Sequence, residues 1–119
     1  MRSCKKDRYI VRLFLMKATT EFSTWIGKMD RSLRIRIDQR LQRLSHGNPG
    51  NHKRFDGLLE IKWSHGSLGS FRVYCTEIKG VILILGGHKG SQKKDIKNSL
   101  MLLEGIKNGK IRVEEYEKL

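Results

Sequence analysis

The chain has 119 residues, enough for one compact domain with a modest core and too few for two ordinary domains. Its 25 Lys and Arg residues against 12 Asp and Glu residues leave a formal net charge of +13, which favours an anionic partner; nucleic acid suits better than a membrane because the basic residues run through the folding segments. No apolar run is long enough for a membrane span, and the spacing of Cys4 and Cys75 suits neither a zinc site nor a redox motif, so we expect a cytoplasmic protein without a metal or cofactor.

The start of the chain predicts a strand followed by a short helix. After a charged, loosely ordered lead-in over residues 1–8, residues 9–17 are rich in Ile, Val, Leu and Phe, which favour a β-strand. Thr19 and Thr20 carry side-chain oxygens that can cap a helix start. The apolar residues that follow recur at helical spacing and are Phe22, Trp25, Ile26 and Met29.

A second, longer helix is predicted next. Asp30 or Ser32 caps its start, and Gly47 is a natural stop. One side of this helix is apolar and much of the remainder is basic. The apolar stripe is Leu33, Ile37, Leu41 and Leu44, and the basic residues are Arg31, Arg34, Arg36, Arg40 and Arg43. We expect the stripe to pack in the core and the arginines to be solvated or to face nucleic acid.

The second half of the chain changes from helical to strand-like periodicity. Residues 47–54 contain the only proline and are expected to form a loop. Apolar and polar residues then alternate over residues 59–63 and 71–76, with a Gly-rich turn between them, as in two strands of a hairpin. Lys79-Gly80 turns the chain into the continuous apolar run of residues 81–85, which we expect at the centre of the sheet because a strand of this kind is covered on both faces.

The last predicted element is a helix. The segment Gly86-Gly87-His88-Lys89-Gly90 is expected to end the strand, and Ser91 to cap a helix with Ile96, Leu100, Leu103 and Ile106 along one side. Residues 108–119 are either a short added strand or a disordered end. The order β-α-α-β-β-β-α predicts an α+β domain over residues 9–107, with a small antiparallel sheet of about four strands, two N-terminal helices and one C-terminal helix.

Three segments of the second half, taken in order, match a known pattern. They are Phe55-Asp56-Gly57-Leu58-Leu59-Glu60-Ile61-Lys62-Trp63, then Phe71-Arg72-Val73-Tyr74, and then Leu85-Gly86-Gly87-His88-Lys89-Gly90-Ser91-Gln92-Lys93-Lys94-Asp95-Ile96. They resemble the Gly-x-x-Glu-Leu-Arg strand, the Tyr-Arg-Val-Tyr strand and the Gly-Gly-Asp-Lys-x-x-Gln-x-x-Asp-Ile helix start of the RelE/ParE superfamily of toxins, which includes the HigB-like addiction-module killer proteins. The resemblance extends over roughly residues 9–107.

This resemblance implies the toxin of a bacterial type II toxin–antitoxin system, a cytoplasmic protein that its cognate antitoxin holds inactive. Better-known relatives are metal-independent endoribonucleases that cleave mRNA on the ribosome and so inhibit translation. Relatives that resemble ParE instead bind DNA gyrase and cleave nothing. A third interpretation is an inactive relative that only binds nucleic acid. The resemblance supports the fold more strongly than it supports any one target.

The candidate phosphate-binding residues follow from the chemistry of RNA cleavage, in which a 2′-hydroxyl attacks the adjacent phosphate and the added negative charge has to be stabilised. Arg72 matches the family's sheet arginine, and Lys62 alternates onto the same polar face. Lys89 matches a basic residue of the family beside the amides of a helix start. The alternatives are solvated side chains, with Arg72 paired to Glu60 across the hairpin.

The proton-transferring group is open at this point and is either a histidine or a lysine such as Lys62. His88 stands where the family pattern has an aspartate, and a histidine ionises near neutral pH, so it suits either direction of proton transfer. His65, in the Gly-rich turn, is an equal rival, whereas His46 and His52 are expected to be loop residues. RelE-like nucleases often carry a tyrosine in residues matching 91–96, and this chain has none there.

The remaining candidates for RNA binding are aromatic and basic. Tyr74 lies on the polar face with Arg72 by alternation and is expected either to stack on a base or to be an ordinary surface tyrosine. Trp25 and Trp63 are assigned to the core. The basic candidates are Lys93 and Lys94 in the last helix and Arg36, Arg40 and Arg43 in the second. Antitoxin binding is a third use open to the arginines of the second helix.

Overall fold

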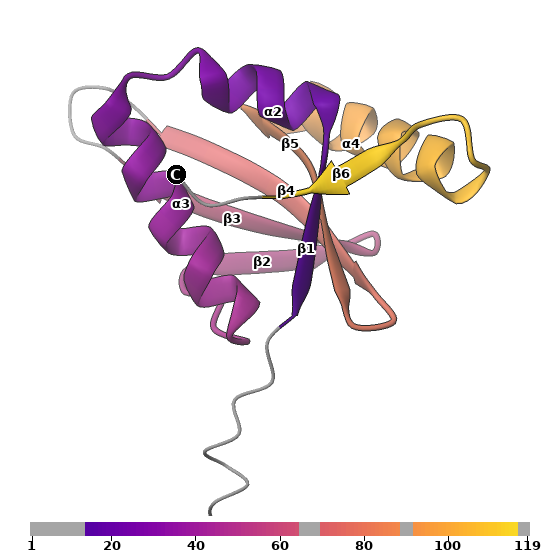
Figure 1. The fold of residues 1–119 in the computed structure, drawn as a ribbon, viewed down its shortest axis with the longest axis horizontal. Helices are drawn as coiled ribbons and strands as arrows, with labels where there is room; N and C mark the ends of the chain where they lie inside the picture. Colours follow the sequence, from indigo (N-terminus) through magenta and orange to yellow (C-terminus); the bar gives the residue numbers. More distant parts are fainter. Residues whose placement is uncertain (1–13, 65–69, 89–91, 117–119) are drawn as a thin grey trace, which may run out of the picture.

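The computed structural model describes residues 14–64, 70–88 and 92–116 of the chain (Figure 1). In chain order, its elements are β1 (Leu15–Thr19), α2 (Thr20–Gly27), α3 (Arg31–Ser45), β2 (His52–Phe55), β3 (Leu58–Ser64), β4 (Ser70–Ile78), β5 (Val81–His88), α4 (Gln92–Lys107) and β6 (Val113–Glu115). The protein is therefore of the α+β class. None of the helices in this part of the chain is long and apolar enough to cross a membrane.

The sheet differs from the predicted one in size and in direction. Six strands pair in the order β2-β3-β4-β5-β1-β6, whereas an antiparallel sheet of about four strands was expected. All neighbours are antiparallel except β1 and β5, which pair in parallel from Leu15 opposite Val81 to Ala18 opposite Ile84. The sheet is mixed because the chain leaves β1 through two helices and returns beside it only after three further strands.

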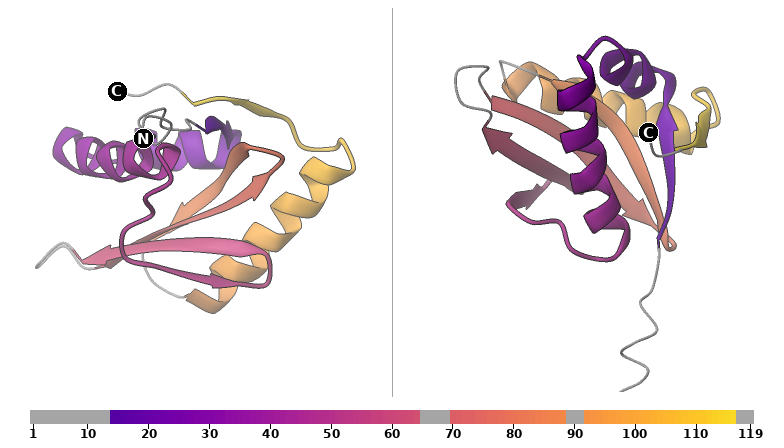
Figure 2. Two further views of the ribbon diagram at one scale, coloured as in Figure 1. Left: turned by 90° about the horizontal axis from the view of Figure 1, so that it is seen from below. Right: turned by 60° about the vertical axis from the view of Figure 1, so that its left-hand side comes forward.

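Two layers of helices cover the two faces of this sheet. In the left view of Figure 2, α2 and α3 lie above the sheet and α4 lies below it. The face under α2 and α3 carries the larger apolar cluster, in which Phe22, Ile37, Ile61, Val73 and Ile84 are fully buried. The other face packs its own cluster, around Tyr74, Leu83, Leu85 and Leu103, against α4. β5 has a helical layer on both sides, which confirms the prediction made from its apolar run.

The helix start and stop signals are confirmed where the structure describes them. The Thr19 side chain accepts a hydrogen bond from the Phe22 amide at 3.1 Å, and Asp30 Oδ1 accepts one from the Leu33 amide, also at 3.1 Å. α3 ends at Ser45, and Gly47 follows with a φ of 87°, a left-handed conformation that favours glycine. The predicted cap at Ser91 and the Gly-rich turn over residues 65–69 lie outside the described residues, as do residues 9–13 of the predicted first strand.

The loop predicted over residues 47–54 is wrong in its second half, because β2 begins at His52. β2 and β3 form a hairpin around Asp56-Gly57, both with positive φ, of 51° and 79°. An Asp-Gly pair is a strong hairpin signal, but four residues before it are too few to show alternation. At the other edge, β6 pairs with β1 in antiparallel fashion, which decides between the two alternatives for the tail in favour of a strand.

The expected end of the central strand at Gly86 is also wrong. β5 continues through Gly86 and Gly87 to His88, with a shift of one residue in its pairing with β4 between Tyr74 and Cys75. The glycines serve close packing here, since a Cβ on Gly87 would lie 2.2 Å from Cζ3 of the Trp25 ring. Trp25 is half-buried against the core, as predicted, whereas the side chain of Trp63 lies outside the described part of the structure.

Candidate active site

Three of the predicted site residues lie side by side across the sheet. The β3–β4 register sets Lys62 opposite Arg72, and the β4–β5 register sets Arg72 opposite His88. We call these three residues the cationic row. The row lies on the face that α4 covers, and its three side chains are partly exposed: that of Arg72 to 15% and that of His88 to 38%. The alternation of polar residues that predicted Lys62 beside Arg72 is therefore confirmed.

A buried carboxylate lies behind the row. Glu60 has no exposed surface; its Oε2 lies 3.7 Å from Arg72 Nε and accepts a hydrogen bond from the Tyr74 hydroxyl at 3.0 Å. Burying a carboxylate is expensive unless cationic and hydrogen-bonding partners compensate it. The predicted cross-hairpin pair of Arg72 with Glu60 is thus present. Because it holds the guanidinium from the inner side, it is compatible with phosphate binding on the outer side.

Tyr74 is a core residue. Its ring is 1% exposed, so the prediction of a surface tyrosine is wrong, and a ring in this position does not suit stacking on a base. Burial and the hydrogen bond to Glu60 raise the pKa of Tyr74 well above its usual value, so the hydroxyl keeps its proton. Alternation along β4 correctly predicted that Tyr74 lies on the same face of the sheet as Arg72. At Tyr74, however, that face is covered by α4.

His88 has a partner that the sequence did not single out. Its Nδ1 lies 2.9 Å from Oδ1 of Asp95, in the first turn of α4. The Asp95 side chain is 9% exposed, and its Oδ2 has no hydrogen-bond partner among the described residues. Burial raises the pKa of Asp95, while the neighbouring His88, Arg72 and Lys94 oppose this shift. Asp95 lies on the buried side of α4, one and two turns before Ser99 and Leu103, and this spacing is the one weak signal in the sequence that pointed to it.

The exposed edge of His88 opens onto a groove along α4. The groove has a volume of about 490 Å³ and is lined by His88, Lys94, Asp95, Lys97, Asn98 and Met101. Lys94 and Lys97 are exposed, so the groove is lined with positive charge. Asn98 Nδ2 donates a hydrogen bond to Oε2 of Glu21 at 2.5 Å, which ties α4 to α2. A polyanion that reached the cationic row along this groove would find positive charge on the way.

The arginines predicted to bind RNA through α3 are not part of this site. Arg36 and Arg43 are exposed on α3, which covers the opposite face of the sheet. Arg40 has a structural role, because its Nη2 donates hydrogen bonds to the carbonyl oxygens of Pro49 at 3.2 Å and Asn51 at 3.0 Å. Burial, with the nearby charge of Arg43, lowers the pKa of Arg40.

The other histidines and lysines divide into described and undescribed residues. His46 caps the C-terminus of α3 and pairs its Nδ1 with the Gln42 carbonyl oxygen at 2.8 Å. His52 is not a loop residue but lies in β2, with Nδ1 2.8 Å from the Gly50 carbonyl oxygen. His65, Lys89 and the side chain of Lys93 lie outside the described part, so their assignments stay predictions. Among the described residues, no three His, Cys, Asp or Glu side chains gather as a metal site.

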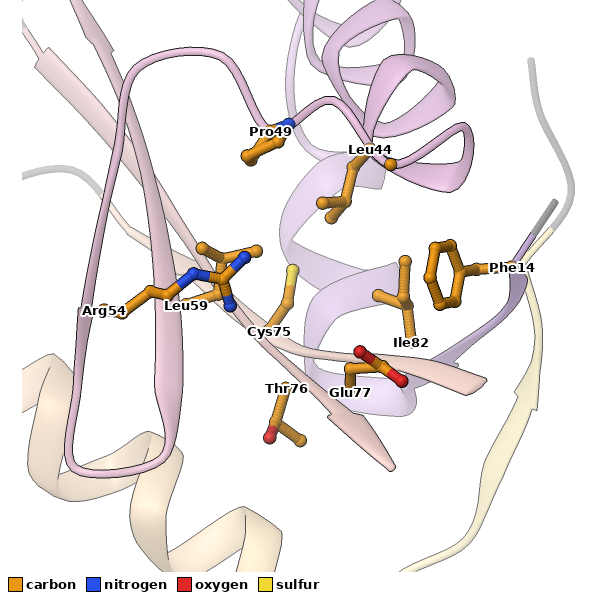
Figure 3. Close-up of a pocket in the computed structure, with 10 residues that line it drawn as sticks. Phe14, Leu44, Pro49, Arg54, Leu59, Cys75, Thr76, Glu77 and Ile82 are labelled. Atoms are coloured by element: carbon orange, nitrogen blue, oxygen red, sulfur yellow. The ribbon is translucent and has the colours of Figure 1, made fainter. Parts of the chain in front are cut away.

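A separate pocket lies at the far end of β4, on the α3 face. It has a volume of about 120 Å³, and Figure 3 shows Phe14, Leu44 and Ile82 on one side of it and Leu59 on the other, with Cys75 between them. Burial raises the pKa of the Cys75 thiol to about 12, so the thiol stays protonated and is a poor nucleophile. The pocket is smaller than those that hold drug-sized ligands, and the cationic row is the better candidate for chemistry.

The fold and the row define a small, basic α+β protein with a mixed sheet, whose ionisable residues gather at one end of three adjacent strands. The chain belongs to the same family as an uncharacterized protein of Haemophilus influenzae (strain ATCC 51907 / DSM 11121 / KW20 / Rd), to which it is 37% identical over 96 residues, a match that covers 76% of this chain and 94% of that protein. No protein-family model and no solved structure matches the chain.

Proposed function

We propose that this protein is an RNA-cleaving toxin of a type II toxin–antitoxin system, similar to the RelE/ParE superfamily. The observation that carries the proposal is the cationic row, in which Lys62, Arg72 and His88 occupy neighbouring positions on three paired strands. A guanidinium and an ammonium can stabilise the charge added to a phosphodiester, and an imidazole beside them can transfer the protons of metal-independent cleavage. The net charge of +13 supports a polyanionic substrate.

In this proposal the residues of the row divide the work between binding and proton transfer. The Arg72 guanidinium presents a planar set of donors to two phosphate oxygens, while the buried Glu60 fixes its inner side. Lys62 adds a point charge on the neighbouring strand. His88 takes or gives the proton at the reacting oxygens. Because Tyr74 is buried, no residue is assigned to stack on a base of the RNA.

The cellular setting of the proposal comes from the family resemblance. The substrate is mRNA on the ribosome, cleavage stops translation, and a cognate antitoxin binds the toxin and blocks it in the cytoplasm. The high positive charge suits an acidic antitoxin segment as well as RNA, so the same surface serves both partners in turn.

The first test is induced expression of the chain in bacteria, with mRNA ends mapped by primer extension. We expect growth arrest with new cuts inside translated messages. Arg72→Ala is a poor variant here, because it leaves the buried Glu60 without its cationic partner, which costs about 3–5 kcal/mol of stability. Arg72→Lys keeps a charge beside Glu60 but loses the planar fork, so we expect it to remain folded and to lose the cuts.

Arg112→Ala is the matched control, since it removes an exposed arginine just before β6 and leaves the row intact. Cuts that persist in Arg72→Lys, Lys62→Ala and His88→Ala alike would overturn the proposed nuclease. Growth arrest without cuts would point to a ParE-like toxin that binds DNA gyrase, and the absence of arrest to an inactive nucleic-acid-binding relative.

A further inference from the structure

We propose that Asp95 is the positioning residue that makes His88 the general base of this site, a role that rests on the proposed RNA cleavage. The resemblance supplies no such pair, because its pattern has an aspartate where this chain has His88. What carries the inference is the contact itself, which joins the end of β5 to the first turn of α4: Nδ1 of His88 lies 2.9 Å from Oδ1 of Asp95.

The contact distinguishes the two nitrogens of the imidazole ring. A carboxylate accepts hydrogen bonds, so Nδ1 is the nitrogen that carries the proton and donates to Asp95. Nε2 of the neutral ring then holds a lone pair. The His88 side chain is 38% exposed and lines the groove along α4, so one nitrogen is anchored on the protein while the ring remains accessible. A ring with one nitrogen fixed in this way is ready to accept a proton.

Asp95 is placed unfavourably for a residue that serves stability alone. It lies on the buried side of α4 with Ser99 and Leu103, and its Oδ2 has no hydrogen-bond partner among the described residues. A well-packed apolar side chain at such a position is often as stable as a buried ion pair or more so. Within the described part of the chain the polar partner of the Asp95 side chain is His88, so a role in orienting that imidazole explains the buried carboxylate.

Other charged groups surround this pair from three elements. Arg72 and Lys62 lie across the sheet on β4 and β3, and Lys94 and Lys97 line the groove on α4. Among these groups Asp95 supplies the negative charge in direct contact with the ring, where it stabilises the imidazolium that forms during the reaction. The carboxylate therefore acts at the step in which positive charge develops on His88.

The step that follows from this geometry is cleavage by the ribose 2′-hydroxyl. Nε2 of His88 takes the 2′-proton, the 2′-oxygen forms a bond to phosphorus, and the bond from phosphorus to the 5′-oxygen breaks. The leaving 5′-oxygen takes a proton from water, and the imidazolium returns its own proton to the hydroxide so formed. The products are a 2′,3′-cyclic phosphate and a 5′-hydroxyl, so RNA is cleaved and a substrate with a 2′-deoxyribose at the cleavage position is not.

The ring itself is observed by nitrogen NMR of the full-length chain labelled with ¹⁵N, without any substrate. We expect the His88 resonances of the wild type to show a protonated Nδ1 and an Nε2 with a lone pair, and those of Asp95→Asn to show a mixture of both tautomers. Glu104→Gln is the matched control, because it neutralises an exposed acid on the same helix, and it should leave the His88 signals unchanged. A wild-type ring with its proton on Nε2, or an unchanged ring in Asp95→Asn, would overturn the inference.

Cleavage kinetics on a ribosome-bound message provide the second measurement. We expect Asp95→Asn to lower kcat by roughly 100-fold or more with KM changed less than threefold, as when an orienting carboxylate is lost elsewhere. Asp95→Glu, which keeps the charge, should recover part of the rate.

The two measurements separate failure of the inference from failure of the proposed function. An oriented His88 ring in a protein that cuts no RNA would refute the nuclease while leaving the pair intact. RNA cleavage that Asp95→Asn slows less than threefold would refute the role of Asp95 while leaving the nuclease intact.

Discussion

Replacing Gly87 by alanine is expected to destabilise the fold, because the new methyl group has no room. A Cβ at Gly87 would lie 2.2 Å from Cζ3 and 2.3 Å from Cε3 of the Trp25 ring, well inside the contact distance of two carbon atoms. The ring belongs to α2 and packs against the main apolar cluster, so it moves only if its neighbours move. The substitution therefore acts on the contact between α2 and the central strand.

The size of the effect follows from two opposing contributions. Overpacking a core costs about 1–3 kcal/mol, whereas glycine to alanine in an unstrained backbone gains about 0.4–1 kcal/mol by restricting the unfolded chain. Neither Gly86 nor Gly87 has a positive φ. Because the overlap with the Trp25 ring is severe, we expect a cost at the upper end of this range, so that Gly87→Ala lowers the free energy of unfolding by about 2–2.5 kcal/mol. Gly86→Ala is the matched control, since its Cβ would meet only Glu21 Oε2 at 3.7 Å, and it should be neutral or slightly stabilising.

Urea denaturation followed by tryptophan fluorescence measures this difference. A loss of about 2 kcal/mol moves the midpoint by about 1 M urea, given the slopes usual for small domains. Gly87→Ala should therefore unfold clearly earlier than both the wild type and Gly86→Ala. If the two alanine variants have equal midpoints, Trp25 does not pack on Gly87, and the placement of α2 over β5 is refuted.

Three further substitutions or modifications test other parts of the structure. Tyr74→Phe removes the hydroxyl that donates to the buried Glu60, and urea titration should show a loss of about 1–3 kcal/mol; a loss below 0.5 kcal/mol, about the size of an exposed contact, would mean that the carboxylate is not buried. In a Cys4→Ser background, Cys75, whose pKa burial raises to about 12, should react with a thiol reagent at pH 8 only after denaturation; equal rates with and without urea would contradict its burial. Burial also raises the pKa of Asp95, so the folded protein holds that proton more tightly than the unfolded chain, and ionisation above the unfolded pKa of about 3.9 weakens the fold. Thermal melts should accordingly show Asp95→Asn as more stable than the wild type at pH 7 and level with it below about pH 4, and no difference at pH 7 would refute the shift.

Local signals in the sequence predicted the helices well. The caps at Thr19 and Asp30, the stop before Gly47 and the apolar stripe of α3 each depend on residues within one or two helical turns, and the structure shows all of them. Alternation on β3 and β4 likewise placed Lys62 and Arg72 on one face. Each of these features is determined by residues that lie close to one another in the sequence.

Pairing between distant segments was not predictable in the same way. β2 and β6 have only four and three residues, so no period can be counted in them. The five residues of β1, Leu-Met-Lys-Ala-Thr, are too few to distinguish a parallel from an antiparallel neighbour in the apolar β5. Asp95 was missed for a related reason: a carboxylate in the first turn of a helix is common at the surface, and its burial depends on how α4 returns over the sheet.

His88 reaches the candidate site because of one irregularity in β5. Between Val81 and Ile84 the strand pairs with β4 in one register, and from Gly86 onward it pairs in a register shifted by one residue. Leu85 is the extra residue, and its side chain joins the cluster under α4. If the side chains simply alternated after Leu85, Gly87 would share its face and His88 would point towards α2 and α3.

The extra residue makes a β-bulge, which reverses the alternation of the side chains after Leu85. The bulge therefore decides which of the following residues face α2 and α3 and which face α4. Gly87 turns to the α2 side, where only a residue without a side chain fits against Trp25, and His88 turns to the α4 side, where it meets Arg72 across the sheet and Asp95 from the helix. Two consecutive glycines ease such a shift, because they carry no side chain that the changed register has to accommodate. The pair Gly86-Gly87, which looks like the end of a strand, is therefore better understood as the feature that brings the imidazole to the same face as the guanidinium.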